Sequence, residues 1–228
     1  MNRTNFRVAL EGKNISKEYN TGETTTSVLK NISLQIDRGD FVSIMGPSGS
    51  GKSTLLYILS GLDEPTGGTV YINGEQVSKL DDNSKSILRR RNIGFVFQFY
   101  NLIPNLSVEE NIMLPVLLDG KKLRDYRVQL NNILDVVGLS DRRTHTPREL
   151  SGGQQQRVAI ARALINDPDI IFADEPIGNL DTTTGKEIME LLKEINLDGN
   201  KTIVMVTHSE DSAKYSNRII NVRDGVVS

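Results

Sequence analysis

Residues Gly46 to Thr54 combine glycines, a lysine and hydroxyl side chains at a spacing that can bind a triphosphate. The segment consists of Gly46, Pro47, Ser48, Gly49, Ser50, Gly51, Lys52, Ser53 and Thr54, and it matches the phosphate-loop pattern Gly-x-x-x-x-Gly-Lys-Ser/Thr at every position. The glycines let the backbone bend so that successive N–H groups point at one anion. Lys52 can reach the β- and γ-phosphates, and the Ser53 hydroxyl can ligate Mg²⁺. The motif therefore predicts a site for a nucleoside triphosphate.

The segments on either side of this motif supply the strand and the helix that a phosphate loop requires. Residues 41–45 are apolar and partly β-branched, as expected of a buried strand, and residues 55–59 continue as a helix. A helix that begins near Lys52 would add the positive end of its dipole to the anion site. The alternative is a glycine-rich turn that binds nothing, and the flanking strand and helix count against it.

Two carboxylates form a second candidate site at the end of another apolar run. Asp174 and Glu175 follow the strand predicted at residues 169–172. Ligands bind beyond the carboxyl ends of parallel strands, so both side chains should emerge beside the phosphate loop. Because alternate residues of a strand point in opposite directions, one carboxylate can hold Mg²⁺ while the other orients water. We assign Asp174 to magnesium and Glu175 to the attacking water as general base; the alternative is a solvated turn.

The segment from Leu150 to Arg157 predicts a second anion site. Ser151 is a favourable N-cap, and Gly152 and Gly153 lead into a helix that starts near Gln154. The backbone N–H groups of such a helix start are free to bind an anion. The alternative is an ordinary helix start that contains glycines.

Composition narrows the classes of protein that need to be considered. The 228 residues suit one α/β domain with a small inserted lobe, and we expect a single domain over residues 1–228. The net charge of −2 argues against a nucleic-acid partner, and the basic run Arg89 to Arg91 is expected on a solvated helix face. No apolar run reaches the roughly 18 residues of a membrane span, and residues 1–5 precede no signal-peptide core. There is no cysteine, so the chain forms no disulfide, and we expect a soluble, cytosolic protein.

Strand-like and helix-like runs are distributed unevenly along the chain. The predicted strands are Val28–Ile36, Phe41–Met45, Thr69–Ile72, Ile93–Phe97, Asp169–Phe172, Thr202–Val206 and Ile219–Val222. The predicted helices include Val108–Leu117, Arg124–Val137 and two apolar stripes, one from Val158 to Ile165 and one from Ile188 to Ile195. This order predicts an α/β fold, a P-loop core with a mostly parallel sheet and an N-terminal antiparallel β layer. The mainly helical stretch at about 99–166 is predicted to be a helical subdomain inserted in that core.

Together the motifs resemble, in order and in spacing, the nucleotide-binding domain of ATP-binding cassette (ABC) proteins over essentially the whole chain. The resemblance implies that the Leu-Ser-Gly-Gly-Gln segment, which includes Ser151 to Gln154, contacts the γ-phosphate held by the opposing subunit. Two chains would then form a homodimer around two ATP molecules and Mg²⁺. The chain would be an ATPase, with Lys52, Glu175 and His208 as its catalytic residues.

Further residues match positions of the family through this resemblance. Gln98 matches the glutamine that senses Mg²⁺ and faces the membrane partner, and His208 matches the histidine that contacts the γ-phosphate. Asp181 matches the loop that communicates across the dimer, and Tyr19 matches the aromatic residue that stacks on adenine. The chain departs from the family pattern at Ile177, where threonine is more frequent.

The segments 174–181 and 111–115 resemble one branch of the family, which includes the ATPases of lipoprotein release, macrolide export and antimicrobial-peptide resistance. A separate integral membrane permease is the implied partner, with this chain on the cytoplasmic face of the cell membrane. Residues 99–106 are expected to form part of the groove for a permease helix, or part of the subdomain core. The alternatives are an ATPase for mechanical signalling, a soluble ABC ATPase outside transport, and a module that binds ATP without hydrolysing it.

Overall fold

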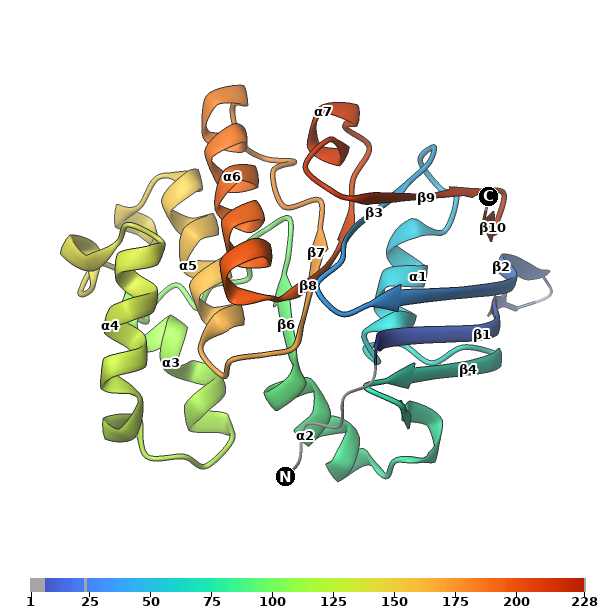
Figure 1. Cartoon of the computed structure of the whole chain (residues 1–228), viewed down its shortest axis with the longest axis horizontal. Coiled ribbons are helices and arrows are strands. Elements are labelled where there is room, and N and C mark those ends of the chain that lie inside the picture. The colour runs from blue at the N-terminus through green and yellow to red at the C-terminus, as the bar shows by residue number, and fades with distance from the viewer. Residues whose placement is uncertain (1–6, 23, 228) are drawn as a thin grey trace.

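A six-stranded sheet forms the centre of the protein, and four of its five strand pairings are parallel. The computed structural model describes residues 7–22 and 24–227. In order across the sheet, the strands are β10 (Val226–Val227), β9 (Arg218–Arg223), β3 (Phe41–Met45), β8 (Thr202–Val206), β7 (Ile170–Asp174) and β6 (Ile93–Val96). Parallel pairing puts the carboxyl ends of β3, β8, β7 and β6 at one edge of the sheet (Figure 1).

The central strands are apolar because both faces of the sheet are covered. Every residue of β7 and β8 is buried. In β8, Ile203 and Met205 belong to the core under the helices, whereas Val204 and Val206 belong to the core next to the second sheet. Strands buried on both faces form continuous hydrophobic runs, which is why the sequence predicted β3 and β8 with the bounds that the structure has.

A four-stranded antiparallel sheet from the first third of the chain lies beside the central sheet (Figure 1). Its order is β2 (Thr24–Asp37), β1 (Val8–Thr21), β4 (Gly67–Ile72) and β5 (Glu75–Gln76). The sequence predicted β2 and β4 in part but missed β1. Register shifts interrupt the pairing of β1 on both sides of Ile15, and Asn14 has a φ of 50°, so apolar residues do not alternate regularly there. The predicted antiparallel layer is confirmed.

Helix α1 (Lys52–Leu59) lies between the two sheets and contacts strands of both. Leu55 and Leu59 are fully buried, in one hydrophobic cluster with Leu10 of β1 and Val204 of β8. This burial anchors the helix that follows the phosphate loop, so the loop is held between a fixed strand and a fixed helix.

Between β6 and β7 the described chain forms helices and turns but no strand. The helices of this region are α3 (Val108–Leu118), α4 (Arg127–Val136) and α5 (Gly152–Leu164), and α6 (Thr182–Gly199) and α7 (Glu210–Ala213) follow later. Short 3-10 turns occur at Val77–Lys79, Leu123–Tyr126, Ser140–Arg142 and Pro147–Glu149. In Figure 1, α3, α4 and α5 lie together on the opposite side of the central sheet from β1, β2 and β4. The predicted α/β fold with an inserted helical subdomain is confirmed, while the single-domain assignment stays a prediction.

The basic run Arg89 to Arg91 was expected on a solvated helix face, but two of its arginines form ion pairs with a buried carboxylate. It ends α2 (Asp82–Asn92), a helix that the sequence did not predict because only one of its residues is buried. Nε of Arg90 and Nε of Arg91 lie 3.4 and 2.9 Å from the carboxylate of Asp119, whose side chain is 1% exposed. Burial raises the pKa of Asp119, but the hydrogen bond from Arg91 helps to hold this pKa below its ordinary value. The cluster therefore ties α2 to the end of α3.

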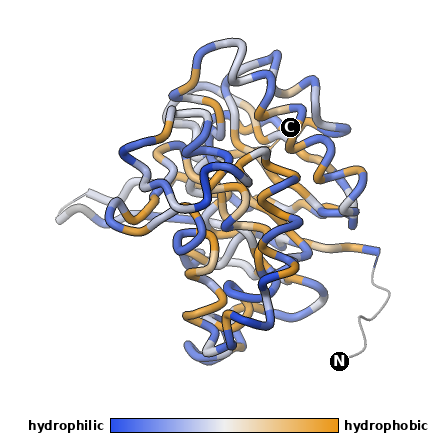
Figure 2. The backbone as a smooth tube through the Cα atoms, turned by 90° about the vertical axis from the view of Figure 1, so that its left-hand side faces the viewer, coloured by the Kyte–Doolittle hydropathy of each residue, from blue (hydrophilic) through white to orange (hydrophobic). Residues whose placement is uncertain are grey.

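Orange and blue alternate along the helices in Figure 2, as expected of amphipathic helices packed on a core. In the described ranges, 7–22 and 24–227, no helix combines the length and the apolar character needed to cross a membrane. Residues 1–5, which the sequence analysis considered for a signal peptide, lie outside the described residues.

Candidate nucleotide-binding site

Four segments of the predicted site lie where neighbouring parallel strands end. The phosphate loop follows β3, His208 lies two residues after β8, Asp174 is the last residue of β7, and Gln98 lies two residues after β6. Because these strands are adjacent and parallel, their carboxyl ends meet at the same edge of the sheet. The structure thus places at one edge four of the segments that the sequence predicted to act on a nucleotide.

The phosphate loop has the geometry of an anion cradle. Gly46 has a φ of 147°, and a Cβ atom there would collide with the carbonyl oxygen of Val222, so only glycine fits. Ser50 is 6% exposed, and its Oγ has no hydrogen-bond partner in the described part of the chain. Gly51 is the N-cap of α1 and offers no side chain to the N–H groups of the first turn. The unpaired hydroxyl and the uncapped helix start both fit a phosphate group.

Lys52 and Ser53 begin α1 and face the loop and the end of β7. Nζ of Lys52 donates a hydrogen bond to the carbonyl oxygen of Pro47 at 2.8 Å, so the ammonium group lies across the loop. Oγ of Ser53 donates to Oδ1 of Asp174 at 3.0 Å. Mg²⁺ prefers such oxygen ligands and takes the rest of its shell from phosphate and water. Among the described residues, no group of three or more His, Cys, Asp or Glu side chains could hold a metal ion.

Tyr57 is a residue of this site that the sequence analysis missed. Its hydroxyl donates a hydrogen bond to Oδ2 of Asp174 at 2.7 Å. Burial, together with the hydrogen bond to Asp174, raises the pKa of Tyr57 to about 12, so the hydroxyl keeps its proton at neutral pH. Tyr57 lies four residues after Ser53 on the same face of α1. That spacing on a predicted helix is the one sequence signal that points to it.

Glu175 and His208 form a close pair beside the carboxylate of β7. Nδ1 of His208 lies 2.6 Å from Oε2 of Glu175. The side chain of His208 is 71% exposed, and that of Glu175 is 20% exposed. Glu175 has a φ of 49°, which is uncommon for a residue other than glycine. Its N–H donates to the carbonyl oxygen of Val206 at 3.0 Å, which fixes the turn directly after β7. A partly buried carboxylate next to an imidazole can accept a proton from water.

Gln98 lies in a turn and contacts the segment that follows β7. Its Nε2 lies 2.8 Å from where a Cβ atom on Gly178 would be, so the amide packs on the backbone of that glycine. Nδ2 of Asn179 donates to the carbonyl oxygen of Gln98 at 3.0 Å. No hydrogen bond within the described ranges joins Gln98 to Ser53 or Asp174. The predicted contact of Gln98 with Mg²⁺ therefore stays a prediction.

The segment Ser151 to Gln154 begins α5 and lies against α6, with Gly152 next to the side chains of Tyr100 and Leu180. Oγ of Ser151 accepts from the N–H of Gln154 at 3.3 Å, and Oε1 of Gln154 accepts from the N–H of Ser151 at 2.9 Å, which forms a capping box. A Cβ atom on Gly153 would collide with Cγ2 of Thr184, so this glycine permits close packing of α5 on α6. In the part of the chain that the structure describes, no hydrogen bond joins this segment to the phosphate loop.

The side chains of Tyr19 and Asp181 form hydrogen bonds with residues other than those at the sheet edge. The side chain of Tyr19 is 42% exposed, and its hydroxyl donates to Oδ2 of Asp63 at 3.0 Å. Asp181 caps α6, where Oδ1 accepts from the N–H groups of Thr183 and Thr184, each at 3.1 Å. The hydrogen bonds from Thr184 hold the pKa of Asp181 below its ordinary value. Adenine stacking by Tyr19 and communication across a dimer by Asp181 stay predictions.

A phosphate loop between β3 and α1, with two carboxylates at the end of β7, a parallel strand of the same sheet separated from β3 by β8, defines a P-loop nucleotide hydrolase. Residues 29–178 match the family model described as ABC transporter. Among solved structures, the dimeric ATP-binding cassette MJ0796 of Methanocaldococcus jannaschii, in a post-hydrolysis state bound to ADP and Pi, has a TM-score of 0.88. It is 48% identical to this chain, and the match covers 96% of each.

Two relatives come from named transport systems. The chain is 48% identical to the lipoprotein-releasing system ATP-binding protein LolD 1 of Rhodopseudomonas palustris, over 94% of this chain and 96% of that protein. It is 50% identical to the macrolide export ATP-binding/permease protein MacB of Bdellovibrio bacteriovorus, over 94% of this chain but 33% of that protein. The chain belongs to the ABC transporter family, and it is an ATPase that binds ATP. The predicted family and enzyme class are confirmed.

Proposed function

We propose that two copies of this chain close around two Mg²⁺-ATP molecules and that ATP hydrolysis between them drives a separate membrane permease. The main support for this proposal is that the phosphate loop, Asp174 and the Glu175–His208 pair meet at one edge of the sheet. The Ser151–Gln154 segment forms no hydrogen bond with them in the described part of the chain. A site that uses this segment takes it from a second copy. The dimeric state of the cassette MJ0796 supports that arrangement.

The phosphate groups would be bound by this chain's loop and by the second copy. The loop N–H groups and the ammonium group of Lys52 stabilise the negative charge of the γ-phosphate, and His208 adds a polar contact. Ser151 of the second copy, at the N-terminus of its α5, contributes a hydroxyl and the positive end of a helix dipole. Tyr19 stacks on the adenine ring, and Asp181 lies at the surface that meets the second copy.

Ser53, Asp174 and Gln98 are the residues that would hold Mg²⁺ with the β- and γ-phosphates. Bound there, the ion neutralises charge on the transferred phosphoryl group. Glu175 orients the attacking water and accepts its proton as general base, and the partly buried position of the carboxylate keeps it close to that water. The close approach of His208 to Glu175 holds the carboxylate in one orientation.

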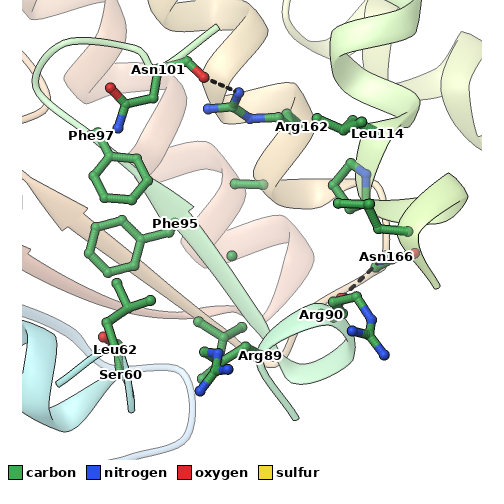
Figure 3. Close-up of a pocket in the computed structure, with 15 residues that line it drawn as sticks. Ser60, Leu62, Arg89, Arg90, Phe95, Phe97, Asn101, Leu114, Arg162 and Asn166 are labelled. Carbon is green, nitrogen blue, oxygen red and sulfur yellow. Dashed lines mark hydrogen bonds between the residues drawn. The ribbon is translucent and has the colours of Figure 1, made fainter. Parts of the chain in front are cut away.

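The permease would dock in a groove between the ATPase core and the helical subdomain. This groove, of about 390 Å³, is lined by side chains of both parts (Figure 3). Phe95 and Phe97 stack with their ring centroids 4.3 Å apart and form an apolar wall, next to Leu62, which is 49% exposed. Arg162 holds the loop after Gln98 by donating to the carbonyl oxygen of Asn101 at 2.6 Å, so the groove adjoins the predicted magnesium sensor.

The chemistry of this groove fits one kind of segment. Apolar side chains line its wall, and Arg89, Arg90 and Arg162 lie around it (Figure 3). A short amphipathic helix with an apolar face and an acidic side chain complements both features. We propose that this helix belongs to the cytoplasmic side of an integral membrane exporter. The relatives LolD and MacB support export of a lipoprotein or a macrolide. An antimicrobial peptide as the cargo rests on the resemblance of segments 174–181 and 111–115 to one branch of the family.

Leu62→Asp is expected to abolish co-purification of the membrane partner while ATP hydrolysis by the isolated chain stays within twofold of wild type. The substitution places a negative charge on the exposed apolar rim of the groove, where it opposes both the apolar face and the acidic side chain of the docking helix. The measurement is affinity capture of the tagged chain from its native membranes, with the partner identified by mass spectrometry.

Leu197→Asp is the matched control, because Leu197 is also an exposed leucine, 65% exposed, near the end of α6 and outside the groove. This variant should retain the partner. Capture of an importer with a substrate-binding protein would contradict export, and capture that Leu62→Asp leaves unchanged would contradict docking in the groove.

A further inference from the structure

The carboxylate of Asp174 is held from two sides by side chains of one helix. Ser53 donates to its Oδ1 at 3.0 Å and Tyr57 donates to its Oδ2 at 2.7 Å. Residues four apart on an α-helix lie on the same face, so both donors point from α1 toward the end of β7. The carboxylate itself is largely buried, with 8% of the residue exposed. Two donors on opposite oxygens fix the rotation of the carboxylate.

The ring of Tyr57 is in turn held in place by packing. Its centroid lies 5.9 Å from that of Phe95, and the two planes are tilted by 44°. Phe95 stacks on Phe97 at 4.3 Å and on Phe172 of β7 at 6.1 Å. Aromatic pairs at these separations favour defined mutual orientations. The hydroxyl of Tyr57 is therefore aimed at Asp174 by an aromatic cluster, of which Phe95 and Phe97 also line the groove in Figure 3.

We propose that Tyr57 is a positioning residue for magnesium: its hydroxyl holds Oδ2 of Asp174 and so leaves Oδ1, next to the Ser53 hydroxyl, facing the ion. The inference rests on the proposed Mg²⁺-ATP site. It deepens that site, because the phosphate-loop pattern ends before position 57 and assigns no role to Tyr57. Groups that hydrogen-bond to a metal ligand orient it, and their loss typically weakens metal binding about 10–100-fold.

The role of the hydroxyl can be separated from that of the ring. Tyr57→Phe removes one oxygen atom and keeps the ring that packs on Phe95. Tyr71→Phe is the matched control, since Tyr71 lies on β4 with its ring beside Lys13, outside the site. Each chain is titrated with ATP in EDTA, and then with MgCl₂ at a fixed ATP concentration, with nucleotide binding followed by calorimetry. A thermal melt of each chain reports that it is folded.

Tyr57→Phe is expected to bind ATP in EDTA within twofold of wild type and to need at least tenfold more Mg²⁺ for half-maximal enhancement of binding. Tyr71→Phe should match wild type in both measurements. Tyr57→Leu, which removes the ring as well, should need a similar excess of Mg²⁺ if the hydroxyl is the group that matters.

An unchanged Mg²⁺ requirement in Tyr57→Phe overturns the positioning role while leaving the proposed Mg²⁺-ATP site intact. A loss of ATP binding already in EDTA also overturns it, because Tyr57 would then support the phosphate loop rather than the metal ligand. If wild type itself binds ATP without any dependence on Mg²⁺, the proposed metal site fails, and the role of Tyr57 fails with it.

Discussion

Replacing Glu175 with glutamine is expected to lower the rate of ATP turnover at least a hundredfold while ATP binding persists. The amide keeps the size of the side chain but cannot accept the proton of the attacking water. General bases contribute about 10²–10⁴-fold to a rate, and no other carboxylate of the described residues lies in the same turn after β7. Lys52 and the phosphate loop are unaffected by the change, so the affinity for ATP should stay within a few-fold of wild type.

The measurement is steady-state phosphate release, together with the dissociation constant for ATP from calorimetry. Glu190→Gln is the matched control, because Glu190 is exposed on α6 and has no place in the site. It should hydrolyse ATP at the wild-type rate. Near-normal hydrolysis by Glu175→Gln would refute its assignment as general base.

Lys52→Ala is expected to weaken ATP binding about 10–100-fold, which corresponds to the loss of about 1.5–3 kcal/mol from one charge-assisted hydrogen bond. Lys52 is 8% exposed, and its ammonium group lies over the loop at the carbonyl oxygen of Pro47. The substitution thus removes the positive charge next to the position of the β- and γ-phosphates. Turnover should fall as well, because the same charge stabilises the transferred phosphoryl group.

ATP affinity is measured by calorimetry in EDTA, where the contribution of magnesium is absent. Lys186→Ala, a change to an exposed lysine of α6, serves as the control and should bind ATP as wild type does. Unchanged affinity in Lys52→Ala would count against its contact with phosphate.

The parts of the site that could be predicted from the sequence are those that depend on residues close together in the chain, such as a continuous apolar run and the polar residues that follow it. The bounds of β3 and β8 are as predicted, because strands covered on both faces are continuous apolar runs. Once those strands are parallel neighbours, the residues that follow them must meet at one edge. The convergence of the phosphate loop, Asp174 and His208 follows from that rule alone.

The elements and contacts that were missed depend on partners far away in the sequence. Helix α2 has no apolar stripe, because it is held mainly by polar contacts such as those of its arginines with Asp119. Strand β1 was missed because its pairing is interrupted by register shifts. Tyr57 was missed because its partner, Asp174, is brought to it by tertiary packing of α1 against β7. None of these leaves a local periodicity in the chain.

Contacts within the described part of one chain do not bring the Ser151–Gln154 segment to the phosphate loop. Its capping box and the packing of Gly153 on Thr184 account for the start of α5 without a ligand. In the proposed dimer, a second copy of the chain would bring this helix start to the phosphate loop. We therefore expect each ATP site to combine the phosphate loop of one chain with the Ser151–Gln154 segment of the other.

The most direct test is the molecular mass of the Glu175→Gln variant by light scattering at micromolar concentration, with and without Mg²⁺-ATP. Blocked hydrolysis should trap the closed state, so the account predicts a shift from the mass of one chain, 25.3 kDa, to that of two when ATP is added. Adding Ser151→Arg to the same variant should prevent the shift. A mass that stays at one chain while ATP is bound at saturation would contradict the composite site.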